Sequence, residues 1–239
     1  MATLFISDLH LSQDRPDITR QFIHFLDDIA SQASALYILG DLFEVWLGDD
    51  MILPDYQRPI AALRKLREHG TEVFVMYGNR DFLMQQGFEE ISGARIIHEP
   101  YLIDLYGTRT LLLHGDILCT DDTEYQKFRA MVRNPQWQSE MLAKSPQERL
   151  AMAKKLREIS KTETAQKAND IMDVNQAAVE AAMREQHVFQ LIHGHTHRPA
   201  EHQFEIDGQL ARRIVLADWY TSGSYLLVDE NGCHTKTLN

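Results

Sequence analysis

The chain has 239 residues, with 24 Lys and Arg against 35 Asp and Glu, two cysteines and a formal net charge of −11. This charge argues against general nucleic-acid binding, which needs a basic face, and two cysteines are too few for a disulfide scaffold. No apolar run approaches the roughly 20 residues of a membrane span, and the start lacks the basic region of a signal peptide. We therefore expect one cytoplasmic domain, with no nucleic-acid or protein partner.

The first 115 residues alternate short apolar runs with helical patterns. Four apolar runs are too short for a buried helix and predict buried strands at 4–6, 36–39, 73–77 and 111–113. Between the first three runs lie two segments with helical apolar spacing, from Phe22 to Ile29 and from Ile60 to Leu66. This alternation predicts an α/β fold, with a mostly parallel sheet and helices on its faces.

The pattern changes after Asp122. No strand pattern appears before residue 187, and helix-favouring segments cover 124–133, 146–160 and 165–185. A strand returns at 188–192, and Asp207-Gly208 and Asn231-Gly232 predict hairpin turns in the tail. We assign residues 1–122 and 187–239 to the core, and 123–186 to a helical insert that forms a cap within the same domain.

Polar side chains follow five predicted strands at the point where each strand ends. These clusters are Asp8-Leu9-His10, Gly40-Asp41, Gly78-Asn79-Arg80-Asp81, His114-Gly115-Asp116 and His193-Gly194-His195-Thr196-His197. Loops at the carboxyl ends of strands in an open α/β sheet converge on one crevice. One such cluster could be a helix cap or a polar turn, but five in succession predict a shared site.

The donor set is chemically distinctive. Carboxylates, imidazoles and an amide oxygen, without thiolate, suit Mn²⁺, Fe²⁺ or Zn²⁺ at a reactive site better than a structural zinc site. The donors outnumber what one ion can use. Two ions about 3.5–4 Å apart, bridged by one carboxylate and a hydroxide, would use them all.

In order and approximate spacing, these five clusters resemble the sequence blocks of the calcineurin-like metallophosphoesterases. The resemblance implies a sandwich with the layers α/β/β/α, and two divalent ions. It implies that one ion is held by Asp8, His10, Asp41 and His197. It implies that the other is held by Asp41, Asn79, His114 and His195, with Asp41 as the bridge.

One position departs from that family. Most members have His after the Asn of the third block, where this chain has Arg80. Arginine cannot act as a general acid at neutral pH, but it can clamp a phosphate. The loss matters for an ester, whose leaving oxygen needs a proton, and matters little for an anhydride, whose leaving phosphate is a weak base. Arg80 therefore favours pyrophosphate cleavage; the alternative is that it only pairs with Asp81 or Asp116.

The insert differs in charge from the rest of the chain. It holds eleven Lys and Arg against nine Asp and Glu, and apolar residues such as Phe128, Met131 and Trp137 accompany them. One interpretation is that these apolar residues only pack the insert onto the core. Basic residues beside such a surface would also suit an anionic lipid headgroup with buried acyl chains.

Longer segments resemble one family more closely. They are Gly40–Glu44, Gly78–Leu83, His114–Asp122, Ile171–Gln176 and His193–Pro199, and they are similar to the UDP-2,3-diacylglucosamine pyrophosphohydrolases of the lipid A pathway. The resemblance implies hydrolysis to UMP and 2,3-diacylglucosamine 1-phosphate (lipid X) by a metal-activated hydroxide that attacks the α-phosphorus. It implies Mn²⁺ as the usual cofactor and a peripheral protein on the cytoplasmic face of the inner membrane.

The same resemblance implies the residues that bind substrate. They are Asn79, Arg80, Asp122, Tyr125, Arg157, Ser160, Thr164, Lys167 and His195. Of the whole set, Asp41, Asn79, Arg80 and His195 would act in catalysis. Two other functions stay open: a soluble pyrophosphohydrolase of other nucleoside diphosphate derivatives, and a non-enzymatic interaction scaffold with this fold.

Overall fold

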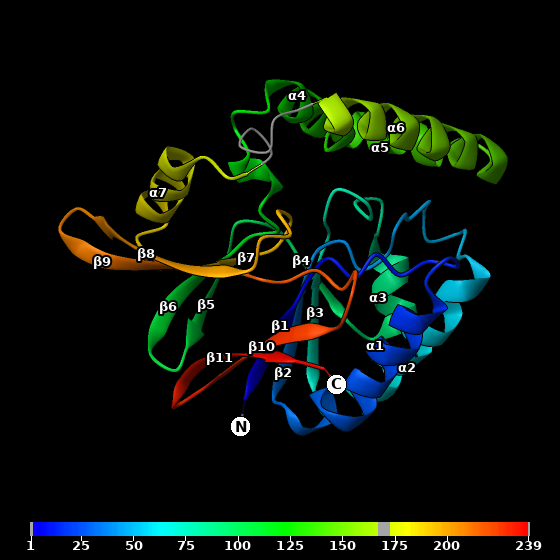
Figure 1. Cartoon of the computed structure of the whole chain (residues 1–239). Helices are drawn as coiled ribbons and strands as arrows, with labels where there is room; N and C mark the ends of the chain where they lie inside the picture. Colours follow the sequence, from blue (N-terminus) through cyan, green and yellow to red (C-terminus); the bar gives the residue numbers. More distant parts are fainter. Residues whose placement is uncertain (1, 167–172, 239) are drawn as a thin grey trace.

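The computed structural model describes residues 2–166 and 173–238, with the side chains of 159–166 left out. Two β-sheets form the centre of the molecule (Figure 1). The first has six strands in the order β11-β10-β1-β2-β3-β4. Its strands are β1 (Thr3–Ile6), β2 (Ala35–Leu39), β3 (Glu72–Met76), β4 (Arg95–Ile97), β10 (Ser224–Asp229) and β11 (Gly232–Thr237). Strands β1 to β4 run parallel, and β10 joins β1 antiparallel.

The second sheet has five strands in the order β5-β6-β7-β9-β8. They are β5 (Tyr101–Leu105), β6 (Thr108–Leu112), β7 (Gln190–His193), β8 (Ala200–Ile206) and β9 (Gln209–Val215). Strand β7 lies parallel to both neighbours, β6 and β9. The turns between β8 and β9 and between β10 and β11 fall at the two predicted dipeptides, so both hairpin predictions are confirmed.

Seven α-helices and three short 3-10 helices complete the described part of the chain. The α-helices are α1 (Pro16–Asp28), α2 (Gln57–Glu68), α3 (Gln86–Ser92), α4 (Thr123–Val132), α5 (Pro135–Leu142), α6 (Pro146–Gln166) and α7 (Gln176–Glu185). The 3-10 helices are Ala30–Gln32, Pro54–Tyr56 and Asp116–Leu118. None of the helices among the described residues is long and apolar enough to cross a membrane.

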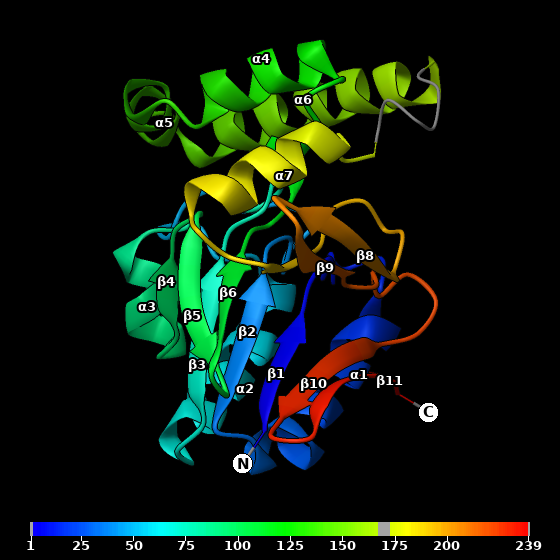
Figure 2. The same cartoon turned by 90° about the vertical axis from the view of Figure 1, so that its left-hand side faces the viewer.

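Burial follows from the alternation of side chains along each strand. Phe5, Tyr37 and Phe74 face the second sheet and meet Leu112 and Ile192 there. The opposite face of the first sheet packs on α1, α2 and α3, and the outer face of the second packs on α7. The layers are therefore α/β/β/α, which confirms the predicted sandwich (Figures 1 and 2).

Two details differ from the sequence analysis. The expected mostly parallel sheet is in fact two mixed sheets, because β5, β8, β10 and β11 each pair antiparallel with a neighbour. The expected helix over 165–185 is interrupted: residues 173–175 are not helical, and the Asn175 side chain accepts a hydrogen bond from the backbone N–H of Ala178 to begin α7. Residues 167–172 of that expected helix lie outside the described part.

Helices α4, α5 and α6 lie together above the sheets, as Figures 1 and 2 show. Helix α7 packs on the second sheet, where Val179 and Met183 are fully buried against Leu111 and Leu191. The three upper helices, here called the cap, thus stand over the edge at which β1, β2, β3, β6 and β7 end. This edge carries all the polar clusters singled out in the sequence.

Candidate metal centre

Backbone hydrogen bonds bring the strand-end loops together. The N–H groups of Asp8 and His10 donate to the carbonyls of Gly40 and Asp41, at 3.1 and 3.0 Å. The N–H of Gly194 donates to the carbonyl of His114 at 2.8 Å. Because each loop is fixed to its neighbour by main-chain contacts, the side chains at these positions converge on one point.

The backbone at these positions is unusual. Eight non-glycine residues of the described chain have a positive φ, a conformation that costs side-chain-bearing residues free energy. Five of the eight are predicted ligands: Asp8, His10, Asp41, His195 and His197. Such strain is typical of functional sites, where the surrounding structure maintains it. The Asp41 side chain also approaches the backbone of Gly78 so closely that only glycine fits there, because a Cβ at this position would lie 2.0 Å from Oδ1 of Asp41.

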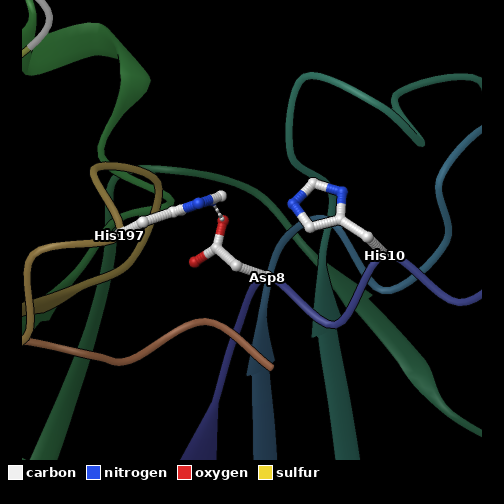
Figure 3. Close-up of side chains that lie close together, drawn as sticks. All are labelled: Asp8, His10 and His197. Atoms are coloured by element: carbon white, nitrogen blue, oxygen red, sulfur yellow. Dashed lines mark ion pairs between the residues drawn. The ribbon is translucent and has the colours of Figure 1, made fainter. Parts of the chain in front are cut away.

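Asp8, His10 and His197 form the first group of ligand atoms. One ligand atom of each lies within 4.8 Å of the others. Nε2 of His197 is 3.4 Å from Oδ1 of Asp8, and Figure 3 shows that carboxylate turned toward the His197 ring. Oδ1 of Asp8 and Nε2 of His10 are buried and have no hydrogen-bond partner among the described residues. A cation would satisfy these atoms, so the donor set fits a metal ion.

Asp8, Asp41 and His114 form the second group, again within 4.8 Å. Nδ1 of His114 donates to the carbonyl of Leu39 at 2.8 Å, which leaves its Nε2 toward the site. Oδ1 of Asn79 lies 3.1 Å from that Nε2 and 3.0 Å from Nδ1 of His195. An amide oxygen and two imidazole nitrogens thus meet beside the two carboxylates.

Asp41 lies between the two groups. Its Oδ2 is 3.7 Å from Nε2 of His10 and 4.0 Å from Nε2 of His114. Its Oδ1 accepts a hydrogen bond from the backbone N–H of Arg80 at 2.9 Å. The side chain is buried, and it faces one histidine from each predicted ion site. Asp8 also contributes to both groups, so the choice of Asp41 as the bridge remains a prediction.

The cluster of carboxylates at the site favours a bound cation. Burial lowers the pKa of His114, but the carboxylates of Asp41, Asp116 and Asp8 outweigh it and raise that pKa to about 9. Burial and the neighbouring His114 lower the pKa of His195 to about 4. The carboxylates therefore draw a proton onto one ligand when no other positive charge is present.

This proton predicts how metal affinity depends on pH. His114 must release it to bind an ion through Nε2, and its pKa of about 9 means that it is protonated at neutral pH. We expect the affinity for Mn²⁺ to rise about tenfold per pH unit between about pH 6 and 8. The EPR signal of free Mn²⁺ in a titration measures this. His24→Ala, which removes an exposed histidine of α1, should leave the slope unchanged; an affinity independent of pH would contradict the prediction.

Arg80 does not take the partners that the alternative hypothesis named. Asp81 accepts from the backbone N–H groups of Leu42 and Gly78, both at 2.8 Å. Asp116 pairs with Arg129 at 2.9 Å. The carboxylate nearest to the Arg80 guanidinium in an ion pair is that of Glu44, at 4.0 Å, and the Arg80 side chain is part-exposed beside the site.

A cavity of about 750 Å³ adjoins the metal ligands and extends beneath the cap. Its walls at the ligand end carry Asn79, Arg80, Arg157, His195 and His197. The remaining wall is mostly apolar and comes from both core and cap: Trp46, Phe82, Leu83, Phe128, Met131, Trp137, Met141, Leu150 and Leu156. One continuous cavity therefore joins arginines and predicted metal ligands to a large apolar wall.

Some of the predicted substrate-binding residues lie in the described part of the chain, and others lie outside it. Asp122 and Tyr125 line the cavity, and the Tyr125 hydroxyl donates to Asp116 at 2.8 Å. Ser160 and Thr164 lie on α6, but their side chains are outside the described part, as is the whole of Lys167. Their predicted roles stay predictions.

Sequence analysis missed three residues at the site. Oε2 of Glu44 is 3.3 Å from Nδ1 of His10, and Oδ2 of Asp218 is 3.7 Å from Nδ1 of His197. The ring of Tyr220 stacks on that of His10, with centroids 5.5 Å apart and planes 5° from parallel. For Asp218 and Tyr220, the sequence signal was the tripeptide Asp218-Trp219-Tyr220, which places polar and aromatic residues just after an apolar strand.

A family model described as calcineurin-like phosphoesterase matches residues 1–199. Three relatives called UDP-2,3-diacylglucosamine hydrolase are similar over nearly the full length. That from Chromohalobacter salexigens is 52% identical and covers 92% of this chain and 89% of the relative. That from Marinobacter nauticus is 50% identical and covers 97% and 95%. That from Pseudomonas aeruginosa strain PAO1 is 51% identical and covers 97% of both.

Among solved structures, a novel archaeal phosphodiesterase is similar, with a TM-score of 0.51, 14% sequence identity and coverage of 100% of both chains. At that identity the likeness concerns the fold alone. It agrees with the two-sheet sandwich described above.

Proposed function

Because the chain belongs to the calcineurin-like phosphoesterase family, we propose that it hydrolyses the pyrophosphate bond of UDP-2,3-diacylglucosamine in lipid A synthesis. The products are UMP and 2,3-diacylglucosamine 1-phosphate. One observation supports this proposal: the predicted metal ligands Asn79, His195 and His197, together with Arg80 and Arg157, line the same cavity as a large apolar wall. A substrate with a pyrophosphate and two acyl chains fits both ends.

The donor set would suit two divalent ions, with Mn²⁺ as the preferred metal. Asp8, His10, Asp41 and His197 would hold one, and Asp41, Asn79, His114 and His195 would hold the other. When bound, such ions would supply an activated water as the nucleophile and polarise the phosphoryl oxygens.

The side chains orient the pyrophosphate. Asn79 and His195, whose side chains lie 3.0 Å apart, would stabilise the charge that develops on the equatorial oxygens of the α-phosphorus. Arg80 and Lys167 hold the departing phosphate of the lipid. Hydrolysis in ¹⁸O-water tests the direction of attack: label in UMP supports attack at the α-phosphorus, and label in the lipid product contradicts it.

The helical insert, residues 123–186, supplies the lipid side. Its α4 carries Phe128 and Met131 and its α5 carries Trp137, and these side chains line the cavity together with the core side chains Trp46 and Phe82. Burying acyl chains there is favourable by about 0.8 kcal/mol per methylene group. Rates on UDP-2,3-diacylglucosamine and on the deacylated UDP-sugar test this: a large preference for the acylated compound supports the proposal, and equal rates favour a soluble nucleotide pyrophosphohydrolase.

Peripheral binding at the cytoplasmic face of the inner membrane fits this substrate. Met131 of α4 is exposed, and it lines the cavity together with Lys127 and Lys154. An apolar side chain flanked by lysines suits the surface of an anionic bilayer. The scaffold hypothesis is not favoured, because a protein used only for interactions has no need of a full set of ligands.

Arg80→Ala should lower kcat/KM for UDP-2,3-diacylglucosamine by about 100-fold, because the leaving phosphate loses a charge-assisted clamp. Arg80→Lys keeps the charge but loses the two-pronged geometry, so it should recover only part of the rate. Steady-state kinetics with saturating Mn²⁺ measures both. Wild-type kcat/KM in Arg80→Ala would remove the reason for preferring an anhydride substrate.

A further inference from the structure

Glu44 occupies a position between the metal centre and the cap. It follows Phe43 in the loop after β2, and its backbone N–H donates to the carbonyl of Leu11 at 3.0 Å. Leu11 and Phe43 also form an isolated β-bridge. These main-chain contacts fix the start of the Glu44 side chain beside the loop that carries His10. The carboxylate is 12% exposed.

The two carboxylate oxygens of Glu44 face different partners. Oε2 lies 3.3 Å from Nδ1 of His10, the ring nitrogen that points away from Asp41. Oε1 lies 2.9 Å from Nη2 of Arg157 on α6 and 4.0 Å from Nη1 of Arg80. One side chain thus contacts a predicted metal ligand, the predicted phosphate clamp of the core and an arginine of the cap.

Each contact has a physical consequence. A carboxylate on the outer nitrogen of a ligating histidine fixes its tautomer and ring orientation, and raises its basicity as a ligand. Two guanidinium groups beside one another repel, and a carboxylate between them reduces that repulsion. Removal of Glu44 would therefore affect both ion binding at His10 and the placement of Arg80 and Arg157.

We propose that Glu44 is a positioning residue that couples the metal centre to the cap. It holds His10 with Nε2 toward the ion, and it holds Arg157 of the cap beside Arg80, where both meet the phosphates of the substrate. The second part rests on the proposed function, because it needs a phosphate-bearing substrate under the cap. The first part concerns metal binding alone.

Metal binding without substrate tests the first part. In Glu44→Ala, the affinity for Mn²⁺ should fall about 10–100-fold, as is usual when a histidine ligand loses its outer partner. Glu44→Gln has the same shape and can still accept a hydrogen bond, so its loss should be smaller. Glu124→Ala removes an exposed carboxylate that also lines the cavity, and Arg157→Ala removes the cap partner; both should keep wild-type Mn²⁺ affinity.

Kinetics with saturating Mn²⁺ test the second part. Arg157→Ala and Glu44→Ala should each raise KM for UDP-2,3-diacylglucosamine about tenfold, because misplaced side chains bind the phosphates poorly. The KM of the double variant should rise by about as much as that of the more affected single variant, because both substitutions disrupt the same contact between Glu44 and Arg157.

Wild-type Mn²⁺ affinity in Glu44→Ala, or an equal loss in Glu124→Ala, would overturn the role toward His10. Independent, multiplying effects of Glu44→Ala and Arg157→Ala on KM would overturn the coupling to the cap. If the wild-type protein does not hydrolyse the acylated substrate at all, the proposed function fails, while the Mn²⁺ titrations still decide the role of Glu44.

Discussion

Asp41→Ala should reduce hydrolysis of UDP-2,3-diacylglucosamine by about 1,000-fold or more. Oδ2 of Asp41 faces both His10 and His114, so the change removes the carboxylate predicted to be shared by both ions. Loss of one preorganised stabilising group already costs about 100–1,000-fold, and here the nucleophile is affected as well. Steady-state rates at saturating Mn²⁺ measure the effect.

Asp14→Ala, an exposed carboxylate of the same type, serves as the control and should keep the wild-type rate. Circular dichroism shows whether the Asp41 variant is folded. A folded Asp41→Ala protein with a rate near that of the wild type would refute a bridged pair of ions.

Asp116→Ala should lower the free energy of unfolding by about 3–5 kcal/mol. Asp116 is fully buried and pairs with Arg129 at 2.9 Å, and it accepts a hydrogen bond from the Tyr125 hydroxyl at 2.8 Å. Both partners lie on α4, so this carboxylate attaches the cap to the loop of His114. Its removal leaves the Arg129 guanidinium with Glu99 as its remaining carboxylate partner and takes away the acceptor of the Tyr125 hydroxyl.

Urea unfolding measures this difference. Asp27→Ala breaks an exposed pair between α1 and Lys65 of α2 and should cost no more than about 1 kcal/mol. Burial raises the pKa of Asp116, but His114 and Arg129 outweigh it and hold that pKa below its ordinary value of 3.8. The carboxylate therefore stabilises the fold above pH 3.8, and this contribution is lost as the pH falls further. A cost for Asp116→Ala as small as that for Asp27→Ala would contradict the role of this carboxylate in holding the cap.

The convergence of the strand ends could be predicted because it follows from topology. Asp8, Asp41 and Asn79 follow parallel strands of one sheet, and such strands end at the same edge. His114 and the His195 loop follow β6 and β7, which are parallel in the second sheet. The sandwich places both edges side by side, and only the resemblance to a known family indicated that there are two sheets.

The residues that the sequence could not indicate depend on loop paths. Glu44 reaches His10 because its loop pairs with Leu11, and Tyr220 reaches it from the opposite end of the chain. No periodic pattern in the sequence indicates either contact. The partners of Arg80 illustrate the same limit. The sequence offered Asp81 and Asp116 as candidate partners, but Asp81 accepts hydrogen bonds from backbone N–H groups and Asp116 pairs with Arg129.

Mass analysis of the products formed from UDP-2,3-diacylglucosamine tests the central claim most directly. With Mn²⁺, the protein should release UMP and 2,3-diacylglucosamine 1-phosphate in equal amounts, and a chelator should stop the release of both. Release of UDP with the free lipid sugar, or product formation that continues unchanged in the chelator, would contradict a metal-dependent cleavage of the anhydride.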